Sequence, residues 1–216
     1  MYQLTWIDKG LIHYVKIVSK NPNDPVEVTN VPNEWQLIGR GNYAAVFIHP
    51  SIPDKVVKVY AENRKGLAEE VQAYQILGKH PSYSELFEFG ERYLVLKKLN
   101  GITLYEALRK GMFIPKSVIK DVDQAIKYAK SKGLNPADIH GKNVMMKGGR
   151  GYILDISDFL MSYDCPRWRD FKRAFYVFYY PIFSRSSFSI PVWLLERVRK
   201  GYQVYIKARG LRQKQG

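Results

Sequence analysis

The stretch DIHGKNV, residues 138 to 144, decides the fold of this chain together with YILDIS, residues 152 to 157. Phosphoryl transfer to a hydroxyl needs a carboxylate that orients the hydroxyl and accepts its proton, and oxygen ligands that hold Mg²⁺ against nucleotide phosphates. Asp138 suits the first task, and Asn143 with Asp155 suits the second. Asp158 is an alternative metal ligand, although the spacing from Asn143 favours Asp155.

A glycine-rich turn lies upstream between two predicted strands, in the segment GRGNYAAVF, residues 39 to 47. Gly39 and Gly41 allow the backbone to approach phosphate oxygens because no Cβ stands in the way. A plain hairpin turn explains the same residues. No helix follows the turn directly, so the pattern does not indicate a dinucleotide-binding fold.

A lysine and a glutamate follow at a spacing that suits phosphate binding. Lys58 lies in the predicted strand KVVKVY, and Glu70 follows on a predicted amphipathic helix over residues 62–77. A lysine directed at phosphates needs a counter-charge, which a helical glutamate packed over the strand supplies. Glu69 is the alternative partner. We expect Lys58 and Asp155 to line a cleft, so that alanine at either position leaves folding intact.

The order of predicted elements is typical of an α+β protein. Residues 1–34 contain β-like runs, LIHYVKIV and PVEVTNV, which predict a β extension. Residues 35–99 predict five strands and one helix. Residues 100–216 predict mainly helices, one of which ends at Gly133, with a hairpin around Gly148 and helix breaks at Pro181 and Pro191.

Composition places the chain among ordinary globular proteins. It has 216 residues, of which 46% are hydrophobic, and its single cysteine, Cys165, has no internal disulfide partner. We therefore expect a packing role for Cys165 and a reducing cytoplasm as the compartment. The amino terminus shows no secretion signal. The apolar stretch 175–183 is too short to span a bilayer and predicts a buried helix, with an interfacial role as the alternative.

The net charge of +14 is concentrated near the carboxyl terminus. Residues 161–216 carry twelve Lys and Arg against three acids, which leaves nine of the fourteen positive charges there. Such a region attracts polyanions such as nucleic acid, anionic lipid or acidic protein. The other interpretation is a solvated surface.

Taken together, residues 35–160 resemble the protein-kinase-like superfamily. The matching segments, in chain order, are the glycine loop GRGNYAAVF, the strand lysine in VVKVY, the helical glutamate in EVQAYQIL, the hinge in YLVLKKLNG, the catalytic loop DIHGKN and the metal-binding triplet in LDIS. The wording of the catalytic loop is similar to that of short bacterial serine/threonine-protein kinases of atypical type and of small-molecule kinases.

The resemblance implies a minimal two-lobed fold with the lobe boundary near residue 99, a β-rich first lobe and a reduced helical second lobe. It implies ATP and Mg²⁺ as cofactors, with Asp138, Lys58, Glu70 and His140 as catalytic residues and Asn143 and Asp155 as metal ligands. The expected nucleotide-binding residues, with adenine near the hinge, are Gly39, Gly41, Ala44, Val46, Lys58, Leu96, Lys97 and Leu99.

Several positions depart from the family pattern. Ala44 replaces the third loop glycine, and Pro136-Ala137 replaces the His-Arg that precedes the catalytic Asp, so the arginine that reads a phosphorylated activation loop is missing. His140 stands where many protein kinases have a lysine that touches the γ-phosphate, although a loop-packing histidine is the other interpretation. Only about ten residues remain for an activation segment before Cys165.

These observations predict a kinase acting on a hydroxyl, on Ser or Thr of a protein. A small-molecule or lipid-headgroup kinase is the second hypothesis, because the activation segment is short. A nucleotide-binding pseudokinase, or an adaptor that binds nucleic acid through the basic carboxyl-terminal region, is the third. The expected partners are ATP, a hydroxyl-bearing acceptor and an anionic partner at the basic region.

Overall fold

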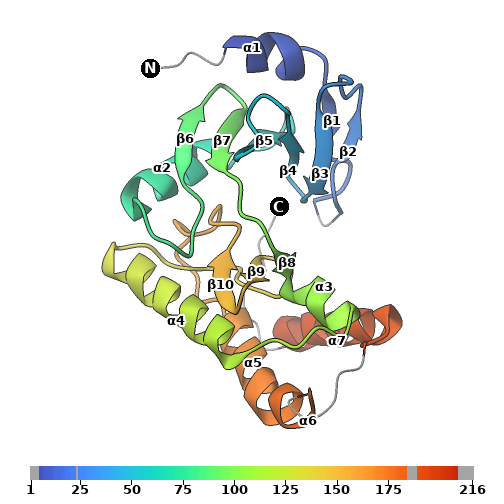
Figure 1. Ribbon diagram of the computed structural model, residues 1–216, viewed down its shortest axis with the longest axis vertical. Helices are drawn as coiled ribbons and strands as arrows, with labels where there is room; N and C mark the ends of the chain where they lie inside the picture. Colours follow the sequence, from blue (N-terminus) through green and yellow to red (C-terminus); the bar gives the residue numbers. More distant parts are fainter. Residues whose placement is uncertain (1–4, 23, 184–188, 209–216) are drawn as a thin grey trace. The chain divides into compact units, whose positions relative to one another are not determined.

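The computed structural model describes residues 5–22, 24–183 and 189–208 (Figure 1). The chain divides into two compact units. The first runs to Gly78 and includes Ser84–Lys98, and the second comprises Lys79–Tyr83 and the chain from Leu99 onward. Strands dominate the first unit and helices the second, so the predicted α+β class with a β-rich amino-terminal region is confirmed.

A five-stranded antiparallel sheet forms the first unit, in the order β3-β4-β5-β7-β6. Its strands are β3 (Gln36–Arg40), β4 (Ala44–Ile48), β5 (Lys55–Tyr60), β6 (Leu86–Phe89) and β7 (Tyr93–Lys97). In β5 the side chains alternate between faces, so Val57 and Val59 are fully buried while Lys58 projects from the opposite face. Helix α2 (Leu67–Leu77) contacts β6 and β7, and begins five residues later than predicted.

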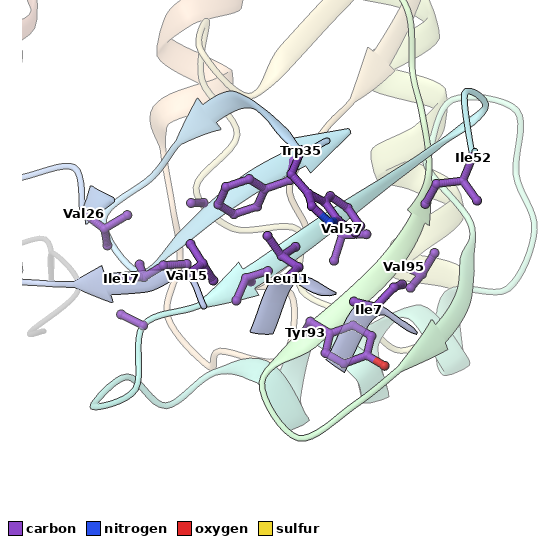
Figure 2. Packing of buried hydrophobic residues seen from close by; sticks show 14 residues of the cluster. Ile7, Leu11, Val15, Ile17, Val26, Trp35, Ile52, Val57, Tyr93 and Val95 are labelled. Atoms are coloured by element: carbon purple, nitrogen blue, oxygen red, sulfur yellow. The ribbon is translucent and has the colours of Figure 1, made fainter. Parts of the chain in front are cut away.

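The core of the first unit lies on the face of the sheet that carries Val57 and Val95 (Figure 2). Trp35, Phe47 and Val59 are buried there as well. Large apolar side chains from neighbouring strands thus share one buried layer, which stabilises the sheet through the removal of apolar surface from water.

The amino-terminal region differs from the predicted β extension. Residues Thr5–Ile7 (α1) and Asp8–Ile12 (η1, a π-helix) are helical, and only Lys16–Val18 (β1) and Glu27–Thr29 (β2) pair as strands. Ile7 and Leu11 are four residues apart and both fully buried in the sheet core. The prediction of a strand over LIHYVKIV was therefore partly wrong, because burial of this helix face outweighs β propensity.

The second unit is built on a long amphipathic helix and a small sheet. Helix α4 (Lys116–Ser131) packs against β10 (Arg150–Ile153), which pairs with β9 (Val144–Lys147). The approach is so close that a Cβ on Gly151 would lie 2.5 Å from the Val118 carbonyl oxygen, so only glycine fits. As predicted, Gly133 follows α4 with a positive φ of 84°.

A short strand and helix complete this part of the second unit. Strand β8 (Ile102–Thr103) pairs with β9, and helix α3 (Leu104–Arg109) follows it. The Thr103 hydroxyl accepts a hydrogen bond from the Glu106 N–H and caps the helix. The helix predicted from Ile102 therefore begins two residues later.

The carboxyl-terminal helices contain one break fewer than predicted. Helix α5 (Arg167–Ala174) continues through the π-helical η2 (Phe175–Tyr179) into α6 (Tyr180–Phe183), so Pro181 does not end the helix. The wider π-turn ahead of Pro181 changes the hydrogen-bonding pattern at the point where proline lacks a donor. Helix α7 (Val192–Ala208) begins directly after Pro191, as predicted.

The apolar stretch 175–183 is mostly exposed, which overturns the prediction of a buried helix. Phe175 is buried, whereas Val177 is 55% and Phe178 is 66% exposed. The buried Phe175 ring stacks on Tyr179 at 5.2 Å. Within the described residues, no helix is both long and apolar enough to span a membrane.

Candidate functional site

An ion pair in the first unit joins Lys58 to Glu70. The Lys58 Nζ lies 2.9 Å from Oε1 and 2.8 Å from Oε2 of Glu70. Glu70 is fully buried and the Lys58 side chain is 13% exposed, whereas Glu69 is exposed on α2. The structure therefore pairs Lys58 with Glu70, the first of the two predicted partners.

Tyr60 adds a second contact to the buried carboxylate. Its hydroxyl donates a hydrogen bond to Oε2 of Glu70, and residues 58 and 60 lie on the same face of β5. A buried carboxylate requires both charge compensation and hydrogen bonds. Lys58 thus supports the fold of this unit, which changes the expectation that alanine at this position leaves folding unaffected.

The glycine-rich turn connects β3 to β4 without backbone strain. Gly39 pairs with Val46, which in turn pairs with Lys58 across β4 and β5. A Cβ on Gly39 would lie 3.8 Å from Val46 Cβ, and one on Gly41 would lie 3.6 Å from the Ala44 carbonyl oxygen. Both are ordinary contacts, so the fold itself does not require glycine at either position.

The end of β7 carries the predicted hinge residues. The Lys97 N–H donates to the Glu85 carbonyl, and its own carbonyl accepts from Ser84 Oγ at 2.7 Å. The Lys98 N–H donates to the Asp54 carbonyl. These backbone groups make hydrogen bonds inside the first unit. The role of Lys97 at the adenine site stays a prediction. Leu96 is buried.

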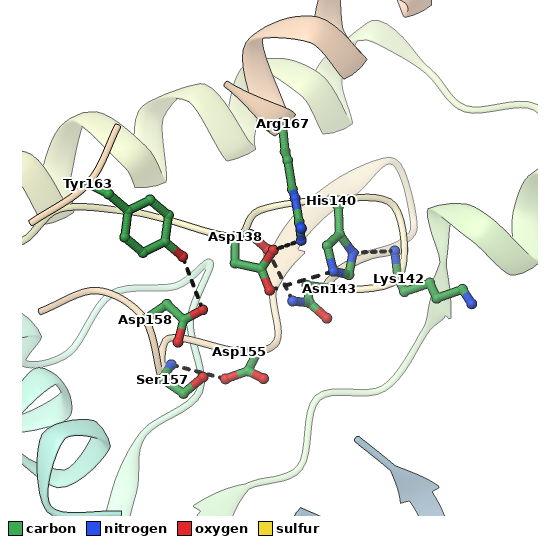
Figure 3. Close-up of polar contacts among 9 residues, drawn as sticks. All are labelled: Asp138, His140, Lys142, Asn143, Asp155, Ser157, Asp158, Tyr163 and Arg167. Atoms are coloured by element: carbon green, nitrogen blue, oxygen red, sulfur yellow. Dashed lines mark hydrogen bonds and ion pairs between the residues drawn. The ribbon is translucent and has the colours of Figure 1, made fainter. Parts of the chain in front are cut away.

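The catalytic-loop segment in the second unit is tied down by its own backbone. The Asn143 and Val144 N–H groups donate to the His140 carbonyl, and the Leu154 N–H donates to the Asn143 carbonyl. The last bond joins the end of the loop to the residue before Asp155. The β9–β10 hairpin thereby brings the two predicted segments, DIHGKNV and YILDIS, next to each other (Figure 3).

Asp138 has a strained backbone and charged neighbours. Its φ is +56°, which is uncommon for a residue other than glycine, and the Asn143 side-chain amide donates to its carbonyl. Its carboxylate contacts the Arg167 guanidinium through Oδ1. Burial raises the pKa of the Asp138 carboxyl, while the charge of Arg167, and that of His140 when its ring is protonated, act in the opposite direction.

His140 is oriented toward Asp138 by a backbone donor. Its Nδ1 accepts a hydrogen bond from the Lys142 N–H at 3.2 Å, and its Nε2 lies 3.8 Å from Oδ2 of Asp138. Burial lowers the pKa of His140, against the opposing effect of the Asp138 charge. The neutral ring then carries its proton on Nε2, facing the carboxylate.

The oxygen groups suited to Mg²⁺ are the side chains of Asn143 and Asp155. The Asn143 Nδ2 donates a hydrogen bond to the Asp138 carbonyl. The Asn143 Oδ1 is therefore the side-chain atom that can bind a cation. Oδ1 of Asp155 accepts from the Ser157 N–H at 3.0 Å. Asp158 is buried and accepts a hydrogen bond from the Tyr163 hydroxyl at 3.5 Å. The partly exposed Asp155 is therefore the better candidate for the metal ligand.

No group of three or more His, Cys, Asp or Glu side chains in the described part of the chain could hold a metal ion. An all-protein metal cage is therefore absent from these residues. The donor set instead fits Mg²⁺, which is usually bound by one or two protein oxygens with the remaining positions taken by substrate phosphates and water.

The segment between β10 and α5 is short and anchored. The Asn135 amide donates to the carbonyls of Met161 and Tyr163, and the Asn135 N–H donates to the Phe159 carbonyl. Phe159 and Ile156 are buried. Cys165 lies in the same segment, where burial raises the pKa of its thiol, in keeping with the expected packing role.

Sequence reasoning missed the place of Arg167 in this site. In the sequence, Arg167 belongs to the basic carboxyl-terminal region, for which an anionic partner was expected. In the structure Arg167 contacts Asp138, and Lys172 lies 3.0 Å from both carboxylate oxygens of Asp123. No local pattern predicts these contacts, because they join residues 29 and 49 positions apart. Both cations therefore have internal acidic partners.

No protein-family model matches the chain. The chain is 31% identical over 174 residues to the "Putative serine/threonine-protein kinase YrzF" of Bacillus subtilis, which covers 79% of this chain and 80% of that protein. It is 29% identical over 85 residues to the "Serine/threonine-protein kinase KSP1" of Saccharomyces cerevisiae, which covers 37% of this chain and 8% of the yeast protein. The extent of the bacterial similarity shows that the chain belongs to the protein-kinase-like superfamily.

Proposed function

We propose that the chain is an ATP- and Mg²⁺-dependent kinase of the atypical bacterial type, which phosphorylates Ser or Thr hydroxyls of proteins in the cytoplasm. The observation that carries the proposal is the conformation of Asp138. A non-glycine residue at φ +56° is costly and is retained mainly where function requires it. Here the Asn143 side chain, itself a candidate metal ligand, holds the strained backbone in place.

The residues of the second unit divide the chemistry among them. Asp138 orients the acceptor hydroxyl and accepts its proton, and His140 faces the same carboxylate through Nε2. Asn143 and Asp155 contribute oxygen ligands for Mg²⁺. When bound, Mg·ATP supplies the phosphoryl group and part of the charge neutralisation that the transfer requires.

Within the first unit, Lys58, Gly39 and Gly41 are the residues proposed to bind phosphate. Lys58 is held by the buried Glu70, so its ammonium group is oriented before any nucleotide arrives. Gly39 and Gly41 meet no steric demand within the fold, which supports a role in admitting phosphate oxygens close to the backbone. Positioning and electrostatics, without a covalent intermediate, account for the proposed catalysis.

The test is thermal stability in the presence of nucleotide. We expect Mg·ATP to raise the melting temperature in proportion to the logarithm of free ATP, and ATP with EDTA to raise it far less. The dependence on Mg²⁺ follows because Asn143 and Asp155 would otherwise face the phosphates as bare acceptors. Equal stabilisation with and without Mg²⁺ would indicate a metal-free binding module instead.

A small-molecule or lipid-headgroup kinase is the second candidate, favoured by the anchored segment after Asp155. Asn135 binds two carbonyls of that segment, which leaves little chain to form a docking platform for a peptide. Incubation with labelled ATP and fractionated lysate separates the candidates. Label in protein supports the first, and label in metabolites or lipid supports the second.

A further inference from the structure

Arg167 contacts the carboxylate that the proposed reaction uses as its base. Its guanidinium donates to Oδ1 of Asp138 (Figure 3). The side chains of Arg167 and Asp138 are each 29% exposed. The pair is therefore ordered yet accessible to a ligand. An arginine presents several donors in a planar fork that matches the oxygens of a phosphate or carboxylate.

Helix α5, which carries Arg167, is held in place by side-chain contacts with α4 and α7. The Trp168 indole N–H donates to Oδ1 of Asp123 at 2.8 Å, and Lys172 binds both oxygens of the same carboxylate. The Tyr202 hydroxyl donates to Asp170 at 2.9 Å. The backbone of α5 is thus held by α4 and α7, while the long side chain of Arg167 can move between partners.

The position of Arg167 on α5 has a cost that packing does not explain. Arg167 is the first residue of the helix, where the helix dipole disfavours a positive charge. A residue that breaks a local rule without a packing benefit is expected mainly at functional positions. Its partner here is a candidate catalytic side chain, not a neighbouring surface acid.

Lys142, the cation within the catalytic loop, contacts groups other than Asp138. The Lys142 ammonium lies 3.8 Å from Oε1 of Glu196 and 4.5 Å from the centre of the Tyr105 ring. His140 is oriented as a neutral ring by the Lys142 N–H. In the part of the chain that the structure describes, Arg167 is therefore the permanent cation in contact with Asp138.

We propose that Arg167 binds the γ-phosphate oxygens of ATP and stabilises their charge during transfer, and that it rests on Asp138 when no nucleotide is bound. This inference depends on the proposed kinase function. In the transfer, the bond between the γ-phosphorus and the β,γ-bridging oxygen breaks and a bond to the acceptor oxygen forms. The hydroxyl proton goes to Asp138, and ADP leaves. Movement of Arg167 to the phosphate also releases Oδ1 of Asp138 for the hydroxyl.

The experiment compares ATP and ADP binding, both with Mg²⁺, by calorimetry on the full chain. We expect the wild type to bind ATP more tightly than ADP, and Arg167→Gln to weaken ATP binding by about 10- to 100-fold while ADP changes less than about twofold. Arg167→Lys keeps the positive charge without the planar set of donors. Its affinity for ATP should lie between those of the wild type and Arg167→Gln. Arg169→Gln is the matched control, since Arg169 is 67% exposed and 3.9 Å from an exposed acid.

Each outcome has a definite meaning. An unchanged ratio of ATP to ADP affinity in folded Arg167→Gln overturns the inference and leaves the kinase proposal intact. Faster turnover of Arg167→Gln with an unchanged ratio of ATP to ADP affinity would mean that Arg167 inhibits Asp138. That result also overturns the inference. Failure of the wild type to bind either nucleotide overturns the kinase proposal itself. If Arg167→Gln does not fold, Arg167→Lys decides: a wild-type affinity ratio in that variant overturns the inference.

Discussion

Each unit of the molecule contains an ion pair at its candidate functional residues, and the two pairs differ in burial. Lys58 and Glu70 have side chains that are 13% and 0% exposed, whereas Asp138 and Arg167 are each 29% exposed. The first pair joins adjacent elements, β5 and α2, across twelve residues. The second joins a loop to the start of α5.

The difference teaches which pair is structural and which is exchangeable. A buried carboxylate that loses its cation remains uncompensated in a low dielectric, so the Lys58 pair has to persist for the sheet and α2 to pack. A partly exposed pair has water as an alternative partner, so a phosphate or a metal-bound ligand can displace it at low cost. The contrast gives the following predictions.

The largest effect is expected in the second unit, on catalysis alone. Under the proposed function, Asp155→Ala should lower phosphoryl transfer by about three orders of magnitude, because a ligand for Mg²⁺ is lost. Folding should persist, since Asp155 is partly exposed. The measurement is single-turnover kinetics across a Mg²⁺ titration, with the exposed Asp164→Ala as control. Near wild-type turnover in a folded Asp155→Ala variant would indicate that Asp158, and not Asp155, is the metal ligand.

The first unit should respond in stability as well as in activity. Lys58→Ala should lower the free energy of unfolding by about 3–5 kcal/mol, because it leaves Glu70 buried without a cation. The double variant Lys58→Met with Glu70→Leu should recover much of this loss while remaining inactive. Urea unfolding measures both.

The control for this comparison is Lys97→Ala, which removes the more exposed ion pair between Lys97 in β7 and Glu85, the residue before β6. Its cost should be about 1 kcal/mol or less. A similarly small loss for Lys58→Ala would mean that the neutral form of Glu70 is tolerated, and the contrast between the two units would disappear.

A smaller effect is expected on the pH dependence of the second unit. Burial raises the pKa of Asp138, so the base should lose activity on acidification at a higher pH than an ordinary aspartate would. Arg167 acts in the opposite direction, so Arg167→Gln should move this acid limb to still higher pH. The profile of kcat/KM against pH tests this, and Arg169→Gln should leave the limb in place. A shift to lower pH would contradict the stated charge effect.

The same shift has a consequence for stability. Because the folded pKa of Asp138 lies above the unfolded value, its contribution favours the folded state at low pH and is lost as pH rises through the folded pKa. Unfolding measured across that interval should show a weaker pH dependence in Asp138→Asn. An identical dependence in both proteins would assign it to other carboxyls.

The smallest effect is expected from phosphate on the segment before α5. Glutamate or alanine at Ser157, Ser162 or Tyr163 should change activity by no more than a few-fold, because Pro136-Ala137 provides no arginine to bind an added phosphate. The Asn135 contacts already hold this segment. Strong activation by any one of these changes would point to Arg167 as the phosphate receptor and would contradict this prediction.

Sequence alone determined much of the first unit and the order of the candidate site residues. The strand and helix patterns around Lys58 and Glu70 are local, and the alternation of valines in β5 sets which face the lysine occupies. The hairpin at Gly148 and the cap at Gly133 follow from the need for positive φ, which glycine meets without strain. Such features depend on residues close together in the chain.

Tertiary structure decided what depends on distant neighbours. Residues 5–12 are helical because Ile7 and Leu11 bury one face in the sheet core, whereas Val177 and Phe178 stay more than half exposed although the stretch that carries them is apolar. Arg167 reaches Asp138 only because Asp123 fixes α5 on α4. Burial and long-range charge pairing are properties of the packed chain, and a periodic pattern of residues does not specify which distant side chain completes them.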